Sequence, residues 1–201
     1  IIDNLSNSDI EVLNRIEKIC GKRPDFIHAN ILNADALNKI FTDYDIYAVM
    51  HFAGLKAVGE SVEKPLLYYR NNVEGSLCLF GQMQKHNIRR IVFSSSATVY
   101  GDPASLPITE ESPLSTNNPY GENKLMVEKK LKDITFSDKN WHVVVLRYFN
   151  PVGAHESGLI GEDPNGEPSN LIAMIAGDSA SSAIANNIFN LLTLGLLVLV
   201  L

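Results

Sequence analysis

A tyrosine and a lysine four residues apart carry the strongest chemical signal in the sequence. Tyr120 and Lys124 belong to the segment Tyr-Gly-Glu-Asn-Lys. In a helix, a spacing of four places both side chains on one face. A phenol normally has a pKa of about 10, and a nearby ammonium group favours the phenolate. The spacing therefore indicates that Tyr120 can act as a general base near neutral pH.

Three consecutive serines, Ser94 to Ser96, follow an apolar stretch that has the character of a strand. In an α/β sheet the carboxyl ends of the strands line the ligand crevice, so a hydroxyl there could hold a sugar oxygen while Tyr120 takes its proton. Alone, a Tyr-x-x-x-Lys spacing is more often chance, and a serine run is often only a polar exit from a strand. Together they form the arrangement of a Ser-Tyr-Lys dehydrogenase, with Ser96, Tyr120 and Lys124 as the catalytic candidates.

Apolar segments rich in β-forming residues predict the strands that would position these groups. Clear strands are expected at 46–52, 90–94 and 142–148, a shorter one at 25–28, and residues 1–3 read as the end of another. Nearly continuous apolar character predicts burial on both faces, as in a parallel sheet.

Helical patterns alternate with these strands. One runs from Ile10 to Ile19 with Gly21 as its stop, and a second follows Asn33. The other two patterns have longer apolar stripes: Leu66, Tyr69, Val73, Leu77 and Phe80 within 62–83, and Leu125, Val127 and Leu131 after Tyr120. The alternation predicts an α/β fold with a Rossmann-like, doubly wound parallel sheet.

Composition excludes several classes of protein. The 201 residues have a formal net charge of -6, so we expect no nucleic-acid partner. Cys20 and Cys78 have no CxxC neighbour and the five histidines show no paired spacing, so we predict reduced thiols and no metal site. The first residues lack the basic and apolar character of a signal peptide.

The character of the sequence changes after Tyr148. Residues 149–168 read as a loop, and no ionisable side chain follows Asp178. The apolar run 191–201 is shorter than the roughly 20 residues of a membrane span. Three interpretations compete: a short buried or interfacial helix, a tail anchor cut by the end of the chain, or translated sequence from a frame change or retained intron. We favour the last.

Several segments resemble one enzyme family closely. They are HFAGLKAVGES at 51–61, SSSATVYG at 94–101, PYG at 119–121, KLMVE at 124–128 and LRYFNPVGAH at 146–155. These segments are similar to those of nucleotide-sugar epimerases in the extended short-chain dehydrogenase/reductase family. The first segment is typical of the UDP-glucose 4-epimerases within it, and the similarity is nearly continuous from residue 1 to about residue 175.

The resemblance implies an activity and its partners. It implies C4 epimerisation that interconverts UDP-glucose and UDP-galactose through a 4-keto intermediate, with tightly bound NAD. It implies a cytoplasmic enzyme with a UDP-sugar substrate, no nucleic acid and no membrane, and a homodimer in the full-length form through helices near 62–85 and 120–135. Residues 1–170 would be a partial NAD-binding domain and residues 171–201 a divergent apolar segment.

The resemblance also implies a role for individual residues. Asp3 would bind the adenosine ribose, and Asn30 stands where the family usually has an Asp that lies against adenine. The implied cofactor-binding set is Asp3, Asn4, Ser8, Asn30, Ile31, Phe52, Ala53, Gly54, Lys56, Asn71, Ser94, Tyr120, Lys124 and Tyr148. The implied substrate-binding set is Lys56, Ser96, Tyr120, Phe149, Asn150, Asn170 and Leu171.

Two parts that the resemblance implies are not found in the sequence. A glycine-rich turn would precede Asp3 by about 20 residues, and a substrate domain would follow Asn170. We therefore expect a sheet without its first strand and its glycine-rich turn, with the C-terminal substrate domain mostly absent. We also expect a chain that alone binds NAD poorly and is inactive.

Other functions stay open at this point. One alternative is a related nucleotide-sugar epimerase or 4,6-dehydratase, although Ala97 and Thr98 stand where a dehydratase would carry acidic residues. Another is an inactive truncated product, or a fragment that serves as a dimer partner.

Overall fold

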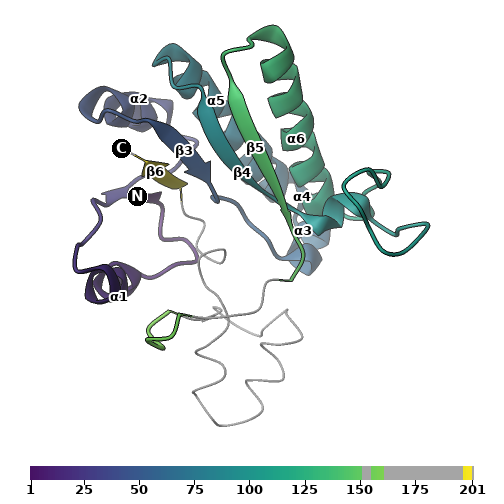
Figure 1. Cartoon of the computed structure of the whole chain (residues 1–201), viewed down its shortest axis with the longest axis horizontal. Coiled ribbons are helices and arrows are strands. Elements are labelled where there is room, and N and C mark those ends of the chain that lie inside the picture. The colour runs from purple at the N-terminus through teal and green to yellow at the C-terminus, as the bar shows by residue number, and fades with distance from the viewer. Residues whose placement is uncertain (151–154, 161–196, 201) are drawn as a thin grey trace. The chain divides into compact units, whose positions relative to one another are not determined.

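The computed structural model describes residues 1–150, 155–160 and 197–200 (Figure 1). The chain divides into two compact units. Unit 1 comprises Ile1–His28 and Asn150–Leu196, and unit 2 comprises Ala29–Phe149 and Leu197–Leu201. Within the described ranges, no helix has both the length and the apolar character needed to cross a membrane.

Unit 1 contains a short parallel strand pair and one helix. Strand β1 (Ile2–Asp3) pairs with β2 (Ile27–His28), and α1 (Glu11–Cys20) lies between them in the chain. Helix α1 ends at Gly21, which adopts a left-handed conformation and donates its N–H to the carbonyl of Glu17 at 2.8 Å. The predicted helix and its glycine stop are therefore confirmed.

Unit 2 is built on three parallel strands. These are β3 (Ala48–His51), β4 (Arg90–Ser96) and β5 (His142–Tyr148), with His51 opposite Phe93 and Phe93 opposite Val145. The predicted α/β class and parallel sheet are confirmed. A fourth strand, β6 (Leu197–Val200), pairs antiparallel with β3. A helix, one of the three interpretations of the 191–201 run, is therefore wrong for 197–200.

Two helices of unit 2 begin at side-chain caps. Asn33 caps α2 (Ala34–Asp43) by accepting from the Ala36 N–H, and Asn118 caps α6 (Pro119–Ser137) by accepting from the Gly121 N–H at 2.8 Å. Helix α6 packs against β4 and β5, and its predicted apolar stripe of Leu125, Val127 and Leu131 is buried. In Figure 1 both α5 and α6 lie behind β4 and β5, so they cover the same face.

The single long helix expected at 62–83 is wrong. The segment forms α3 (Val58–Glu63), α4 (Pro65–Tyr68), the π-helical η1 (Tyr69–Glu74) and α5 (Gly75–Lys85). Pro65 disfavours the helical conformation of Lys64, whose φ is −127° and ψ is 54°. The π turn then changes the phase of the helix. In α4, Leu66 of the predicted stripe is 82% exposed, whereas Tyr68, which was not part of that stripe, is fully buried.

Burial along the strands differs between the two faces of the sheet. In β4 the side chains of Ile91, Phe93 and Ser95 are buried, and those between them are half-buried. Val144 of β5 is 51% exposed. Among the described residues, the expected burial on both faces therefore holds for one face only. Ser95 is on the buried face, and its hydroxyl contacts Glu128 of α6.

Candidate active site

The carboxyl end of β4 and the first turns of α6 bring the catalytic candidates together. Strand β4 ends at Ser96, whose side chain accepts from the Thr98 N–H at the start of the 3-10 turn η2 (Ala97–Tyr100). Tyr120 and Lys124 lie on successive turns of α6, with the Lys124 ammonium 5.8 Å from the centre of the Tyr120 ring. The predicted strand-end serine and the helical Tyr-Lys pair are thus neighbours.

Lys124 is a buried ammonium group with defined partners. It is 7% exposed, donates to the carbonyl oxygen of Ser94 at 2.7 Å, and lies 5.1 Å from the centre of the Phe93 ring. Burial lowers the pKa of Lys124 to about 8, and the negative charge of Glu128 opposes this shift. Lys124 therefore remains mostly protonated at neutral pH.

The electrostatics of Tyr120 differ from the expectation. Burial raises the pKa of Tyr120, while hydrogen bonding with Ser96 lowers it. We expected the neighbouring ammonium to dominate and lower the pKa, but that ammonium is bonded to the Ser94 carbonyl. Desolvation is the larger effect, so in this structure the pKa of Tyr120 lies above its ordinary value rather than below it.

The backbone of Tyr120 is fixed by two other elements. Its N–H donates to the hydroxyl of Ser61 in α3 at 3.2 Å, and Ser61 is fully buried. Gly121 packs against η2, where a Cβ atom would lie 2.9 Å from the Thr98 carbonyl oxygen. Ser61 is a residue that our site prediction missed, although it ends the segment HFAGLKAVGES that carries the resemblance.

The loop after β3 approaches the ammonium of Lys124. Gly54 has a φ of +158°, and a Cβ there would lie 3.2 Å from the Asn72 side-chain oxygen and 3.9 Å from the Lys124 Nζ. Asn72 binds both backbone groups of Leu55, accepting from its N–H at 2.8 Å and donating to its carbonyl at 2.9 Å. Asn71 donates to the same Asn72 oxygen at 3.0 Å. The prediction named Asn71 and missed Asn72, which holds the loop.

The other cofactor candidates of unit 2 vary in exposure. Phe52 and Ile31 are buried, Ala53 is half-buried and Lys56 is exposed. The Asn30 side-chain oxygen accepts from the Leu32 N–H at 2.9 Å. This oxygen, at the position where the family usually has an Asp carboxylate, therefore takes part in a local turn.

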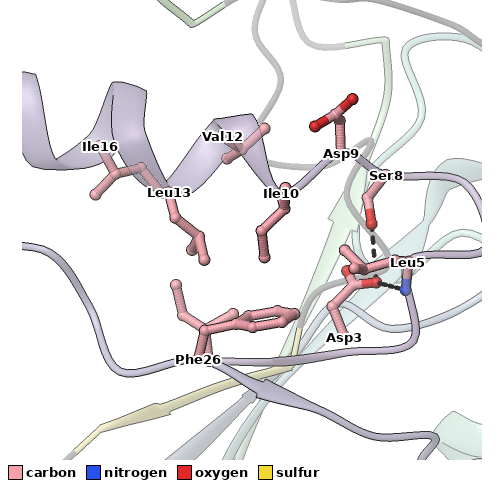
Figure 2. Close-up of a pocket in the computed structure, with 10 residues that line it drawn as sticks. Asp3, Leu5, Ser8, Asp9, Ile10, Val12, Leu13, Ile16 and Phe26 are labelled. Carbon is pink, nitrogen blue, oxygen red and sulfur yellow. Dashed lines mark hydrogen bonds between the residues drawn. The ribbon is translucent and has the colours of Figure 1, made fainter.

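Unit 1 holds the candidates near the start of the chain around a small pocket (Figure 2). One carboxylate oxygen of Asp3 accepts from the Leu5 N–H at 2.6 Å and from the Ser8 hydroxyl at 2.8 Å. The other oxygen is buried without a partner in the described part of the chain. Asn4 accepts from the Ser6 N–H. The remaining lining is mostly apolar: Ile10, Val12, Leu13, Ile16 and Phe26. The pocket thus places the carboxylates of Asp3 and Asp9 beside an apolar wall.

An open hollow follows the end of β5. It is lined by Tyr100, Ile108, Thr109, Glu110 and residues 145–149, which include the candidates Tyr148 and Phe149. Burial raises the pKa of Tyr148. Asn150 is an exposed residue of unit 1, and Asn170 and Leu171 lie outside the described residues.

Comparison with known proteins identifies the family. A model described as the NAD dependent epimerase/dehydratase family matches residues 1–189. The chain belongs to this family. The chain is also similar to named proteins, and these matches cover most of its residues.

Two curated relatives of this family member are both UDP-glucose 4-epimerases. It is 57% identical over 175 residues to UDP-glucose 4-epimerase of Dictyostelium discoideum, a match that covers 87% of this chain and 51% of that protein. It is 54% identical to UDP-glucose 4-epimerase of Bacillus subtilis strain 168, covering 88% and 52%. The chain therefore spans about half the length of the curated relatives it matches.

Solved structures agree with this assignment. A crystal structure of UDP-glucose 4-epimerase from Bifidobacterium longum in complex with NAD+ and UDP superposes with a TM-score of 0.84 at 52% identity. The match covers 87% of this family member and 52% of that chain.

Proposed function

We propose that this chain carries the catalytic groups of an NAD-dependent enzyme that epimerises UDP-glucose and UDP-galactose at C4. The observation that carries the proposal is the meeting of Ser96, Tyr120 and Lys124 at the end of β4. The names of the similar proteins support the sugar nucleotide, and the structure in complex with NAD+ and UDP supports the cofactor. We further propose residues 1–170 as the NAD-binding domain.

We propose contacts to NAD within each unit taken by itself. The unpartnered, buried oxygen of Asp3 suits a ribose hydroxyl donor, with Asn4 and Ser8 beside it. In unit 2 Gly54 lets the backbone come close to a ligand. The remaining proposed contacts are Asn30, Ile31, Phe52, Ala53, Lys56, Asn71, Ser94, Tyr120, Lys124 and Tyr148. When bound, NAD supplies a hydride acceptor and a cationic ring.

The chain's own residues would move and orient the proton. Tyr120 takes the proton of the sugar 4-hydroxyl as a hydride leaves C4, which gives a 4-keto sugar. Ser96 orients the oxygen at C4, and the Lys124 ammonium stabilises the phenolate. After the sugar presents its other face and C4 is reduced again, Tyr120 would return the proton to the oxygen. The proposed sugar-nucleotide contacts are Lys56, Phe149, Asn150, Asn170 and Leu171.

A chimera tests this function, because the chain covers about half of its relatives. Residues 1–175 would replace the matching segment of the Bacillus subtilis relative, and conversion of UDP-galactose to UDP-glucose would be measured. We expect the chimera to be active and Tyr120→Phe to lower kcat by about 10²–10⁴-fold. The exposed Tyr47 provides the control Tyr47→Phe, which should leave kcat unchanged. A Tyr120→Phe chimera with normal kcat would refute the assignment.

We also propose that the full-length protein is a cytoplasmic homodimer. Apolar side chains of α3, α4 and α5 that are exposed in this chain support an interface there: Val62, Leu66, Leu67 and Leu77. Light scattering with size-exclusion chromatography should give the dimer mass for the chimera. Leu66→Glu should give a monomer, and an unchanged mass would place the interface elsewhere.

A further inference from the structure

The last three residues of β4 each contact a different residue of α6. The Ser94 carbonyl accepts from Lys124 and the Ser95 hydroxyl donates to Glu128, while the Ser96 hydroxyl lies close enough to Tyr120 to lower its pKa. The Tyr, Lys and Glu are spaced four apart, so they lie along one side of the helix. Two of these three helix residues belong to the proposed catalytic set, and Glu128 does not.

Glu128 is the most heavily bonded of the three. One carboxylate oxygen accepts from the Ser95 hydroxyl and from the Arg147 Nε at 3.1 Å, and the other accepts from the Arg147 Nη2 at 2.7 Å. Arg147 also donates to the Tyr100 hydroxyl at 2.8 Å, and its guanidinium lies 5.1 Å from the centre of that ring. Glu128 therefore connects β4, β5 and η2 to α6 at the level of the site.

We propose that Glu128 is a positioning residue for the proposed epimerisation, which fixes the end of β4 against α6 and supplies the buried negative charge that faces Lys124. This inference rests on the proposed function. Among the residues that the structure describes, three titratable groups face Lys124: Tyr120 and Glu128 on α6, and His51 on β3. His51 is buried and its pKa is lowered to about 3, so it is neutral near pH 7. Of these three groups, Glu128, which pairs with Arg147, supplies the negative charge opposite Lys124.

A purely structural ion pair would behave differently. Arg89 and Asp138 form a second Arg–carboxylate pair, at 2.9 Å, where α6 ends and β4 begins. Loss of either pair should lower the unfolding temperature. Only loss of the Glu128 charge should also change the titration of Lys124, because an opposite charge close to an ammonium favours its charged form.

The experiment measures the titration of Lys124 in the 201-residue chain. Lysines carrying ¹³C at Cε would be followed by NMR against pH, with Lys124→Arg to assign the signal. In Glu128→Gln we expect the pKa of Lys124 to fall by about one unit or more. In the matched control Asp138→Asn we expect no change. An unchanged Lys124 titration in folded Glu128→Gln, or an equal fall in Asp138→Asn, would overturn the proposal.

A second variant covers the case in which Glu128→Gln does not fold. Glu128→Asp keeps the charge and shortens the side chain, so the pKa of Lys124 should stay close to that of the wild type. A fall as large as that expected for Gln would contradict the role of the charge.

Kinetics of the chimera separate this inference from the proposed function. Glu128→Gln should lower kcat at least tenfold, change KM little and displace the pH profile of kcat, and Glu128→Asp should restore part of kcat. Asp138→Asn should leave kcat and its pH profile unchanged. An inactive chimera would count against the proposed function, while the NMR titration would still decide the role of Glu128. A normal kcat with a normal pH profile in Glu128→Gln would reject the positioning role.

Discussion

The two ends of the β4–α6 pair use the same kind of bridge in different surroundings. At the carboxyl end of β4, Arg147 binds Glu128 at 2.7 Å, and at the amino end Arg89 binds Asp138 at 2.9 Å. The Glu128 side chain is 8% exposed and the Asp138 side chain 28% exposed. Both bridges therefore join an arginine to a carboxylate, and they differ in how deeply the carboxylate is buried.

The neighbours of the two bridges explain the difference. Arg89 also donates to the carbonyls of Met83 and Gln84 at the end of α5, and it lies 5.4 Å from the Trp141 ring. These contacts satisfy carbonyl groups at the end of α5, which is a structural role. At the carboxyl end, Lys124 adds a buried charge beside the Arg147–Glu128 pair. Such groups cost stability, so we infer that this end is organised for chemistry.

The largest expected difference between the ends is in stability. Glu128→Ala should lower the free energy of unfolding by about 3–5 kcal/mol, because it leaves a partly buried guanidinium without its partner. Asp138→Ala should cost much less, since the Asp138 carboxylate is more exposed than that of Glu128. Urea unfolding followed by circular dichroism measures both values. Equal losses would mean that burial does not separate the two bridges.

The ends should also respond differently to pH. His51, at the carboxyl end of β3, is fully buried, and its pKa falls from 6.5 to about 3. The unfolded chain binds a proton in this window and the folded chain does not, so stability is complete above pH 6.5 and is lost as pH falls toward 3. The loss is about 1.4 kcal/mol per pH unit.

His51→Gln should remove this dependence, and unfolding in urea between pH 5 and pH 7 would measure it. The matched control is His142→Gln at the exposed start of β5, which should keep the dependence. If His51→Gln and the wild type lose stability in parallel, another group is responsible.

The next largest effect on stability is expected at Gly101, which follows η2 beyond the carboxyl end of β4. Gly101 has a φ of +56°, and a Cβ there would lie 1.7 Å from the Ser115 carbonyl oxygen. Gly101→Ala should therefore cost about 2–3 kcal/mol through strain and a backbone shift. A Cβ added at Gly81 in α5 would meet open space, so Gly81→Ala should raise stability by up to about 1 kcal/mol. Thermal unfolding of both variants tests the contrast, and a neutral Gly101→Ala would contradict it.

The smallest effect is expected at the amino end. The ring nitrogen of Trp141 is buried without a partner among the described residues. Trp141→Phe removes this unsatisfied donor and some packing, so the two effects oppose each other and the net change should stay within about 1 kcal/mol. Urea unfolding followed by circular dichroism would check this, and a loss of several kcal/mol would show that the ring organises this end.

Much of the architecture could be predicted from the sequence, because periodicity reports burial. The strands that contain Ser94 and His51 and the helix that carries Leu125 and Leu131 have strong patterns, and all are present. The break at Pro65 was also visible in the sequence, since proline restricts the residue before it. The π turn at Tyr69–Glu74 could not be predicted, because no local pattern in the sequence marks the extra residue per turn that a π-helix contains.

The site was predicted only in part. Tyr120 and Lys124 are four residues apart, so helical geometry alone brings them together. Glu128 meets Ser95 and Arg147 only because Ser95 lies opposite Arg147 in the paired strands β4 and β5. Contacts set by strand register cannot be derived from spacing along the chain, and this is why Glu128 was missed.

The pairing of β6 with β3 bears on the order in which the sheet assembles. Strands β3 and β4 are joined by a chain of roughly 40 residues, whereas β3 and β6 are separated by roughly 150. Closing the longer loop costs about 1 kcal/mol more in chain entropy. We therefore expect the three parallel strands to assemble first and β6 to add last, so that its amide hydrogens exchange with solvent before those of β4.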